Sequence, residues 1–220
     1  MLDTLLELDR SLLLFFNQGH TLYWDQVMWI YTGKLVWIPL ILSMVYVAFR
    51  CGGWREGVWF VLVAGLVALL CDQFSSSVCK PFFERYRPAR DPDFSSMVTI
   101  VNGYRGGMFG FFSSHAANAA GIVVYTALIF RNKLYAATAV LWALLTCYSR
   151  MYLGVHYPGD ILAGLLWGIL MGWGGFFLYK KMRPFFFGDV PSPYSGCRFV
   201  GIITVVVYCL LYTSPSPRDA

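Results

Sequence analysis

The sequence predicts an all-α fold: a polytopic membrane helix bundle of about five to six transmembrane helices, preceded by an N-terminal amphipathic helix at the membrane interface. Two observations lead to this prediction. Apolar residues make up 58% of the 220 residues and charged residues only 13%, a balance that a soluble domain of this size would not keep on its surface. The apolar residues also form runs that approach the roughly 20 residues needed to cross a hydrocarbon core.

The amphipathic helix is expected within residues 1–18. Apolar residues recur at helical spacing here, with Asp3, Glu7 and Asp9 between them, a pattern typical of a helix lying on a membrane surface. The stretch lacks both a basic leading segment and a small-residue cleavage site, so we expect no cleavable signal peptide.

Five apolar runs follow, each apolar around its whole circumference, as expected of membrane-spanning helices. They cover about 28–49, 57–74, 115–130, 135–149 and 159–179, and a sixth begins near Phe199. In the fifth run, Gly164, Gly168 and Gly172 recur every four residues, which favours close packing of a neighbouring helix over a catalytic role. We therefore expect residues 1–208 to form one membrane-embedded domain.

The C-terminal residues have a different origin in this interpretation. The segment from Cys209 to Asp219 resembles the translation of a sequencing adapter, so residues 209–220 are treated as an artefact. The sixth run is then cut short, and the natural chain would continue beyond about residue 208.

The basic residues indicate an orientation. Two longer loops, 75–114 and 150–158, emerge on one side of the predicted bundle. The opposite side carries the basic residues that the positive-inside rule expects of cytoplasmic loops, namely Arg50, Arg55, Arg131, Lys133, Lys180, Lys181 and Arg183. The two longer loops should therefore face away from the cytoplasm. Because they are also basic, they are expected to bind an anion.

Two other readings of the composition are set aside. The net charge of +5 is divided among short loops, with no basic block or aromatic-interleaved face, so nucleic-acid binding is not expected. The six cysteines suggest no disulfide framework, because Cys51, Cys71 and Cys147 lie in or beside apolar runs. Cys79 is then a lone thiol in a loop.

A first polar cluster runs from Lys80 to Pro88 and contains Arg87. An ammonium group and a planar guanidinium are both suited to gripping a phosphate. Taken alone, the cluster is weak evidence for such a site, because basic side chains that reach the lipid headgroups explain it better.

A second cluster contains Ser113, Ser114 and His115 ahead of a run of small residues. A serine cap and the free N–H groups of a helix start form a ready anion site. His115 is suited to donate a proton to a leaving group, because the pKa of imidazole lies near neutrality. The alternative is a simple helix cap with an interfacial histidine.

A third cluster places Arg150, His156 and Asp160 within one short turn and the start of the next helix. A carboxylate beside a histidine holds the ring in one tautomer and stabilises the positive charge that appears when the other nitrogen attacks. Burying three ionisable side chains in an otherwise apolar membrane protein costs free energy, which indicates a functional role for them. Asp72 and Asn118 lie near the loop ends, and the sequence assigns them no role.

Taken together, the clusters resemble the signature of the type 2 phosphatidic acid phosphatase superfamily, and in particular its undecaprenyl pyrophosphate phosphatase and phosphatidylglycerophosphatase branch. The pattern is K-x-x-x-x-x-x-R-P, then P-S-G-H, then S-R-x-x-x-x-x-H-x-x-x-D. The first and third parts match at every specified position. The second departs twice, with Phe112 for the proline and Ser114 for the glycine. The resemblance covers roughly residues 20–183.

The resemblance implies a membrane phosphatase that hydrolyses a lipid phosphomonoester or pyrophosphate. His156 would attack phosphorus to form a phosphohistidine, His115 would serve as acid and then as base, and Asp160 would orient His156. The phosphate would be held by Lys80, Arg87, Ser113, Ser114 and Arg150. No metal and no cofactor would be required.

Several alternatives stay open at this point. A lipid phosphotransferase would share the intermediate and differ only in the acceptor, a nonenzymatic lipid carrier would fit the composition, and a vanadate-dependent haloperoxidase uses a similar pocket in a soluble protein. Undecaprenyl pyrophosphate, phosphatidylglycerol phosphate and a lipid A phosphate all suit a site flanked by interfacial aromatic residues such as Trp24, Trp29, Phe82, Phe83 and Phe94. The expected location is the bacterial cytoplasmic membrane, multi-pass, with the site facing the periplasm or exterior. The sequence predicts no oligomeric state.

Overall fold

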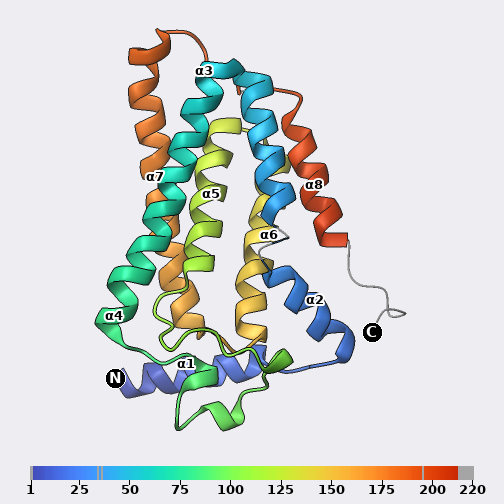
Figure 1. The fold of residues 1–220 in the computed structure, drawn as a ribbon, viewed down its shortest axis with the longest axis vertical. Coiled ribbons are helices and arrows are strands. Elements are labelled where there is room, and N and C mark those ends of the chain that lie inside the picture. The colour runs from blue at the N-terminus through green and yellow to red at the C-terminus, as the bar shows by residue number, and fades with distance from the viewer. Residues whose placement is uncertain (1, 34, 36, 195, 213–220) are drawn as a thin grey trace.

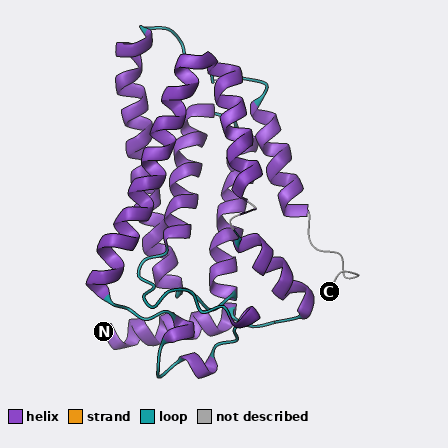
Figure 2. Cartoon of the chain, in the orientation of Figure 1, coloured by secondary structure: helices purple, strands orange, loops and turns teal. Residues whose placement is uncertain are grey.

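The protein is all-helical in the computed structural model, which describes residues 2–33, 35, 37–194 and 196–212 (Figure 2). Within those ranges there is no β-strand, and the only bridge of that kind is an isolated one between Tyr86 and Phe109. The predicted all-α class is confirmed. The prediction that residues 209–220 are an artefact falls largely outside the described residues, because only 209–212 are described, as the end of a helix.

The helices form an elongated bundle with a cross-lying helix at one end (Figure 1). Their bounds are α1 Leu2–Phe16, α2 Leu22–Thr32, α3 Trp37–Gln73, α4 Lys80–Phe83, α5 Ser114–Phe130, α6 Lys133–Tyr152, α7 Pro158–Phe187 and α8 Val200–Tyr212. Helices α3, α5, α6, α7 and α8 run along the long axis. The loop 84–113 and the turn between α6 and α7 gather at the end where α1 lies, so the two predicted special loops do share one side.

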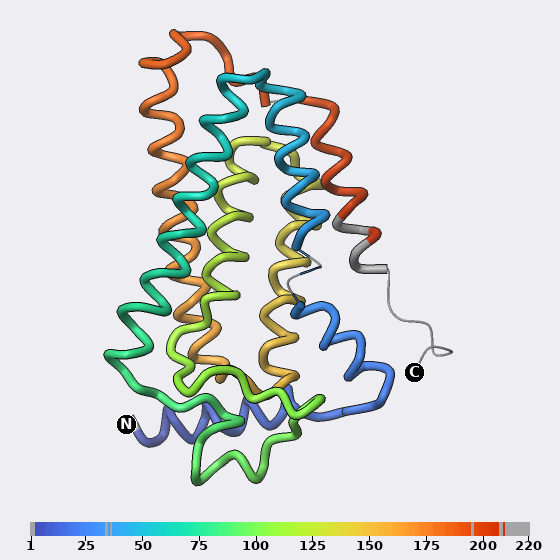
Figure 3. Tube along the Cα trace, viewed as in Figure 1, coloured from blue at the N-terminus to red at the C-terminus, as the bar shows by residue number. Residues whose placement is uncertain are grey.

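Helix α1 matches the predicted amphipathic helix. Leu13 is fully buried against the bundle, whereas Leu5, Leu8 and Phe15 are more than half exposed. The tube in Figure 3 shows α1 crossing the end of the bundle rather than running along it. Apolar side chains on the outer face of such a helix suit insertion into the headgroup boundary.

Helix α3 is a helical hairpin. At Gly53 the backbone has φ 69° and ψ −174°, which breaks the helix and folds its two arms beside each other (Figure 1). A side chain would be strained there, and glycine is not. The two arms correspond to the predicted runs 28–49 and 57–74.

The predicted start of the first run was wrong. Residues 28–32 belong to α2, and the chain is extended at Gly33, where φ is −69° and ψ is 152°. Helix α3 then begins at Trp37, with Pro39 in its first turn, where proline costs no hydrogen bond. Hydropathy averaged over the run concealed this break, although Thr32, Gly33 and Lys34 do interrupt the apolar residues.

The predicted loop 75–114 was wrong at its beginning, since the chain stays helical through Phe83. A π-helix, Phe74–Cys79, connects α3 to α4. The wider turn accommodates Pro81, which has no N–H and would clash with the preceding turn of a regular α-helix. Lys80 therefore lies on a helix rather than a loop, and Cys79 is buried in the π-helix, not in a loop as predicted.

Helices α5 and α7 pack most closely, and the glycine stripe lies at their contact, as predicted. A Cβ added at Gly168 would lie 2.3 Å from the carbonyl oxygen of Ala117, and one at Gly172 would lie 2.4 Å from that of Gly121. Glycine at these positions lets the two backbones touch. The contact fixes α5 relative to α7.

Replacing Gly168 with valine is therefore expected to destabilise the folded protein by about 1–3 kcal/mol, the usual cost of overpacking. The added atoms would force α5 and α7 apart, because their nearest neighbour is rigid backbone. Thermal unfolding in detergent measures the effect. Gly174→Val is the matched control in the same helix, since a Cβ there meets nothing within 4 Å. Equal melting temperatures for the two variants would contradict the packing argument.

The cysteine prediction was wrong for one pair. Cys51 and Cys197 form a disulfide with their Cα atoms 6.2 Å apart. Cys51 ends the first arm of α3 just before Gly53, so it faces the segment that leads into α8 rather than the middle of an apolar run. Cys71 and Cys147 are buried free thiols, as expected.

Two helical stretches are long and apolar enough to cross a membrane, among the residues described: Trp37–Phe83 and Pro158–Phe187. Helix α5 is apolar but shorter. The predicted number of about five to six spans therefore stays a prediction. The short sixth run packs against the bundle as α8, with Val200 and Ile203 buried.

Arg183 differs from the other basic residues at the end opposite the longer loops. Its side chain is buried and forms a salt bridge with Glu56, with Nε 2.6 Å from Oε1. Tyr179 donates a hydrogen bond to the same carboxylate. Arg183 thus forms an internal ion pair and carries no free surface charge. It is therefore no longer one of the basic residues that support the predicted orientation.

Candidate active site

The predicted site residues come from separate elements that meet at the end of the bundle covered by α1. Lys80 begins α4, Arg87 lies in the loop 84–113, Ser113 caps α5, Ser114 and His115 begin α5, Arg150 ends α6, His156 precedes α7 and Asp160 lies in the first turn of α7. The structure therefore gathers all eight at one end of the bundle, where the first turns of α5 and α7 lie near the last turn of α6 (Figure 1).

His156 lies in a buried turn and is 1% exposed. Its Nε2 is 3.0 Å from Nη1 of Arg87, and its Nδ1 is 3.4 Å from Oδ2 of Asp160. Because a guanidinium only donates, Nε2 must be the accepting nitrogen and carry a lone pair. The proton of the neutral ring then sits on Nδ1, facing the carboxylate.

Asp160 is fully buried and bonded on both oxygens. Oδ2 accepts the backbone N–H of Tyr157 at 3.0 Å, and Oδ1 accepts from Nη1 of Arg85 at 2.8 Å. The first bond caps the N-terminus of α7, where a carboxylate also interacts favourably with the helix dipole. The carboxylate is thereby fixed in front of His156.

Arg85 and Asp9 were missed by the sequence analysis. Nη2 of Arg85 is 2.6 Å from Oδ2 of Asp9, and Oδ1 of Asp9 accepts the N–H of Gly159 at 2.7 Å. Burial lowers the pKa of Arg85, but the carboxylates of Asp160 and Asp9 together outweigh it, so the pKa is raised overall. A chain of charges thus runs from α1 through Arg85 to Asp160. The basic pattern of 80–88 did include Arg85, but nothing in the sequence pairs it with residue 9.

Arg87 is 8% exposed and held by backbone carbonyls as well as by His156. Its Nε donates to the carbonyl of Phe109 at 3.1 Å, and its Nη1 donates to that of Val155 at 3.1 Å. Burial and the charge of Arg150 lower the pKa of Arg87 to about 10, so the group stays charged at neutral pH.

Arg150 and Lys80 each have N–H groups that are not fully used in hydrogen bonds within the described residues. Arg150 is 2% exposed, its Nη1 donates to Thr32 at 2.6 Å, and its Nε is buried with no hydrogen-bond partner among the described residues. Nζ of Lys80 lies 3.4 Å from the hydroxyl of Ser76. Buried donors without partners are costly, and an anion would satisfy them.

The start of α5 is built as predicted. Ser113 is fully buried, and its hydroxyl accepts the N–H of Ala116 at 3.4 Å as the N-cap. Its own N–H donates to the carbonyl of Asp160 at 3.1 Å, which ties the start of α5 to that of α7. Ser114 and His115, in the first turn, border a cavity.

The pKa of His156 is affected by its burial and by the cationic side chains around it. Burial lowers its pKa well below the ordinary value, and nearby positive charges, those of Arg87, Arg150, His115 and Lys80, lower it further. The imidazole is therefore neutral at physiological pH, with an unprotonated nitrogen in a strongly positive pocket.

A family model described as the PAP2 superfamily matches residues 57–185, a stretch that contains all eight predicted site residues. The chain belongs to this superfamily. It is therefore a phosphatase, a hydrolase of phosphoric esters, in a family of membrane proteins that act on lipid phosphates. The resemblance inferred from the three clusters is confirmed at the level of the family.

Two curated relatives extend the match beyond residues 57–185, one of them over nearly the whole chain. A lipid A 4'-phosphatase of Bacteroides thetaiotaomicron is 34% identical over 223 residues, covering 96% of this chain and 99% of the relative. A lipid A 4'-phosphatase of Porphyromonas gingivalis is 37% identical over 181 residues, covering 81% of this chain and 75% of the relative.

One solved structure shares the PAP2 fold. The crystal structure of a transmembrane PAP2 type phosphatidylglycerolphosphate phosphatase from Bacillus subtilis aligns with a TM-score of 0.60 at 24% identity, over 82% of this chain and 86% of that one. At this identity the likeness concerns the fold alone.

Proposed function

We propose that the protein hydrolyses a phosphate ester of a membrane lipid through a phosphohistidine formed on His156. The geometry of the His156 ring supports this most directly. Nε2 carries the lone pair and faces Arg87, while Nδ1 faces Asp160. A neutral imidazole held in this tautomer, in a pocket of cations, suits nucleophilic attack on a phosphate.

The proposed first step transfers the phosphoryl group. A phosphate oxygen replaces Nε2 as the acceptor of Arg87, while Lys80, Arg150, Ser113 and the N–H of Ser114 bind the remaining oxygens. Nε2 then attacks phosphorus, and the bond from phosphorus to the lipid oxygen breaks.

The leaving oxygen takes its proton from His115, acting as general acid. In the second step His115, now neutral, takes a proton from water. The hydroxide equivalent attacks the phosphohistidine, inorganic phosphate leaves, and Nε2 regains its lone pair. Asp160 stabilises the positive ring of His156 throughout.

We further propose that lipid A phosphate, carrying its phosphate on a sugar, is the substrate class. The support is the similarity to two lipid A 4'-phosphatases, one of which aligns over 99% of its own length. Undecaprenyl pyrophosphate and phosphatidylglycerol phosphate are the competing substrates, and transfer to a second lipid instead of water is the competing reaction.

Phosphate release in detergent with EDTA tests this proposal on all three lipids. Release that survives EDTA is expected, because side-chain cations take the place of metal ions at the phosphate. We expect kcat/KM to be highest for the lipid A phosphate. Loss of release in EDTA would contradict the metal-free mechanism, and a higher value for another lipid would contradict the substrate class. A phosphorylated second lipid in place of free phosphate would indicate a transferase.

The proposed location is the bacterial cytoplasmic membrane, with the site on the outer side. The basic residues at the far end, such as Arg50, Arg55 and Lys133, support this orientation. The Cys51–Cys197 disulfide lies at the same far end and argues for the reverse orientation, because disulfides seldom persist in the cytoplasm, so the orientation needs a direct test.

Cysteine labelling tests the orientation. Asp93 and Asp189 are exposed aspartates at opposite ends of the bundle. In a Cys209→Ser background, a membrane-impermeant maleimide applied to spheroplasts is expected to label Asp93→Cys at once and Asp189→Cys only after lysis. The reverse pattern would place the site in the cytoplasm.

A further inference from the structure

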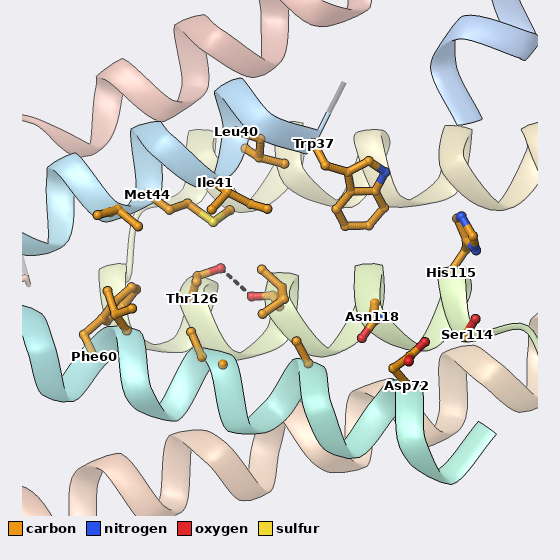
Figure 4. Close-up of a pocket in the computed structure, with 16 residues that line it drawn as sticks. Trp37, Leu40, Ile41, Met44, Phe60, Asp72, Ser114, His115, Asn118 and Thr126 are labelled. Atoms are coloured by element: carbon orange, nitrogen blue, oxygen red, sulfur yellow. Dashed lines mark hydrogen bonds between the residues drawn. The ribbon is translucent and has the colours of Figure 1, made fainter. Parts of the chain in front are cut away.

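A cavity of about 520 Å³ lies between the two arms of α3 and α5 (Figure 4). This volume is within the range of ligand-binding pockets. Most of its wall is apolar, for example Leu40, Met44, Phe60, Ala64 and Ile122. The catalytic steps proposed above do not use this space.

One end of the cavity is polar and belongs to the active site. Figure 4 shows His115, Ser114, Asn118 and Asp72 grouped at that end, while Phe60 and Thr126 lie toward the other. A molecule in the cavity would therefore approach His115, the residue assigned to protonate the leaving oxygen. The cavity is placed to hold the leaving half of the substrate.

The apolar part has the dimensions of one acyl chain. His115 and Thr126 are eleven residues apart on α5, which corresponds to about 16 Å along the helix. One leaflet of a hydrocarbon core about 30 Å thick has a similar depth. The cavity is also open at the side, since Gly65 lines it and a Cβ built there meets nothing within 4 Å.

The polar end has hydrogen-bonding groups without partners. Oδ1 of Asn118 is buried and accepts no hydrogen bond from the described chain. Asp72 makes no hydrogen bond or salt bridge with a described residue, although its charge acts on Lys80. A carboxylate repels a phosphate of like charge, so Asp72 at this end is suited to a hydrogen-bond donor on another part of the substrate. Both groups call for donors on the ligand.

We propose that this cavity is a specificity subsite for the leaving group, with an acyl chain in the apolar part and a hydroxyl or amide N–H hydrogen-bonded to Asn118 and Asp72. The subsite rests on the proposed function. It selects acylated amino-sugar phosphates, which carry such donors beside the phosphate, over lipids that carry none. A site built to pair with a donor rejects an analogue that lacks it, because its own polar groups then stay unsatisfied.

The test compares three substrates on the full-length protein in detergent. They are a phosphorylated glucosamine lipid with amide and hydroxyl donors, a diacylglycerol phosphate of the same chain length without donors, and soluble p-nitrophenyl phosphate. Asn118→Leu is expected to lower kcat/KM at least tenfold for the glucosamine lipid, and less than twofold for the other two substrates. Equal losses on all three, or no loss, would overturn the subsite.

Gly65→Phe tests the apolar part separately. Its ring would fill the cavity from the open side, so hydrolysis of both lipids should fall at least tenfold while that of p-nitrophenyl phosphate is retained. Unchanged lipid hydrolysis by Gly65→Phe would show that no acyl chain of the substrate enters the cavity. Melting temperatures confirm that the variants fold, and Asn118→Ala, which removes the acceptor without added bulk, replaces Asn118→Leu if that variant does not fold. No release from any lipid by the folded wild type would overturn the proposed function itself, an outcome distinct from a uniform loss in the variants.

Discussion

Replacing His156 with alanine is expected to reduce phosphate release by on the order of 10⁶-fold, the scale of loss when a hydrolase loses its nucleophile. The buried turn around His156 is held by other contacts, among them the bond from Tyr157 N–H to Asp160, so the fold should survive. The measurement is steady-state phosphate release from the best lipid, with melting temperature as the control for folding.

A labelling experiment separates the nucleophile from the acid. Wild type mixed with radiolabelled p-nitrophenyl phosphate and quenched in base should carry base-stable, acid-labile label, and His156→Ala should carry none. His115→Ala should still become labelled, because nitrophenolate leaves without a proton, and the label should persist because no base activates water. Label on His156→Ala, or residual turnover near that of wild type, would contradict the assignment.

The sequence was informative about the site because its parts are local. His156 and Asp160 are four residues apart at a helix start, and Ser113 and His115 lie in one cap, so chain geometry alone brings their side chains near each other. Helix ends also fix which side of the bundle each motif occupies. The eight predicted residues therefore meet as expected, although their roles stay proposals.

The missed features depend on contacts between distant segments. Arg85 joins Asp9 to Asp160 across 76 and 75 residues, and no periodicity encodes such a pairing. Similarly, Cys51 meets Cys197 only because α3 folds back at Gly53. Helix boundaries failed where composition and backbone path diverge: the chain breaks at Gly33 inside the run predicted as one helix, and it stays helical through the serines of Phe74–Cys79. Hydropathy reports burial in lipid and not the path of the backbone.

Asp160→Asn is the second variant with a large expected effect, a loss in kcat on the order of 10⁴-fold. If its oxygen continued to accept from Arg85, the amide would turn its NH2 toward Nδ1 of His156 and would lose the bond that Oδ2 accepts from the N–H of Tyr157. Nδ1 would then become the acceptor, the proton would move to Nε2, and the lone pair needed for attack would be lost. Because Asp160 does not touch the phosphate, KM should change little. A comparable rise in KM would instead indicate a collapsed pocket.

Asp9→Asn provides a graded control for the same chain of charges. It weakens the pair with Arg85 but leaves the bond from Arg85 to Asp160 and the acceptor for Gly159 N–H in place. The ring of His156 should therefore keep its tautomer, and kcat should fall less than about tenfold, as for a partly exposed ion pair. If Asp9→Asn were as damaging as Asp160→Asn, the carboxylate of Asp160 would owe its position to α1 rather than to its own bond with the N–H of Tyr157. If both variants kept wild-type kcat, the orientation of His156 would not depend on this carboxylate, and the tautomer argument for the nucleophile would fail.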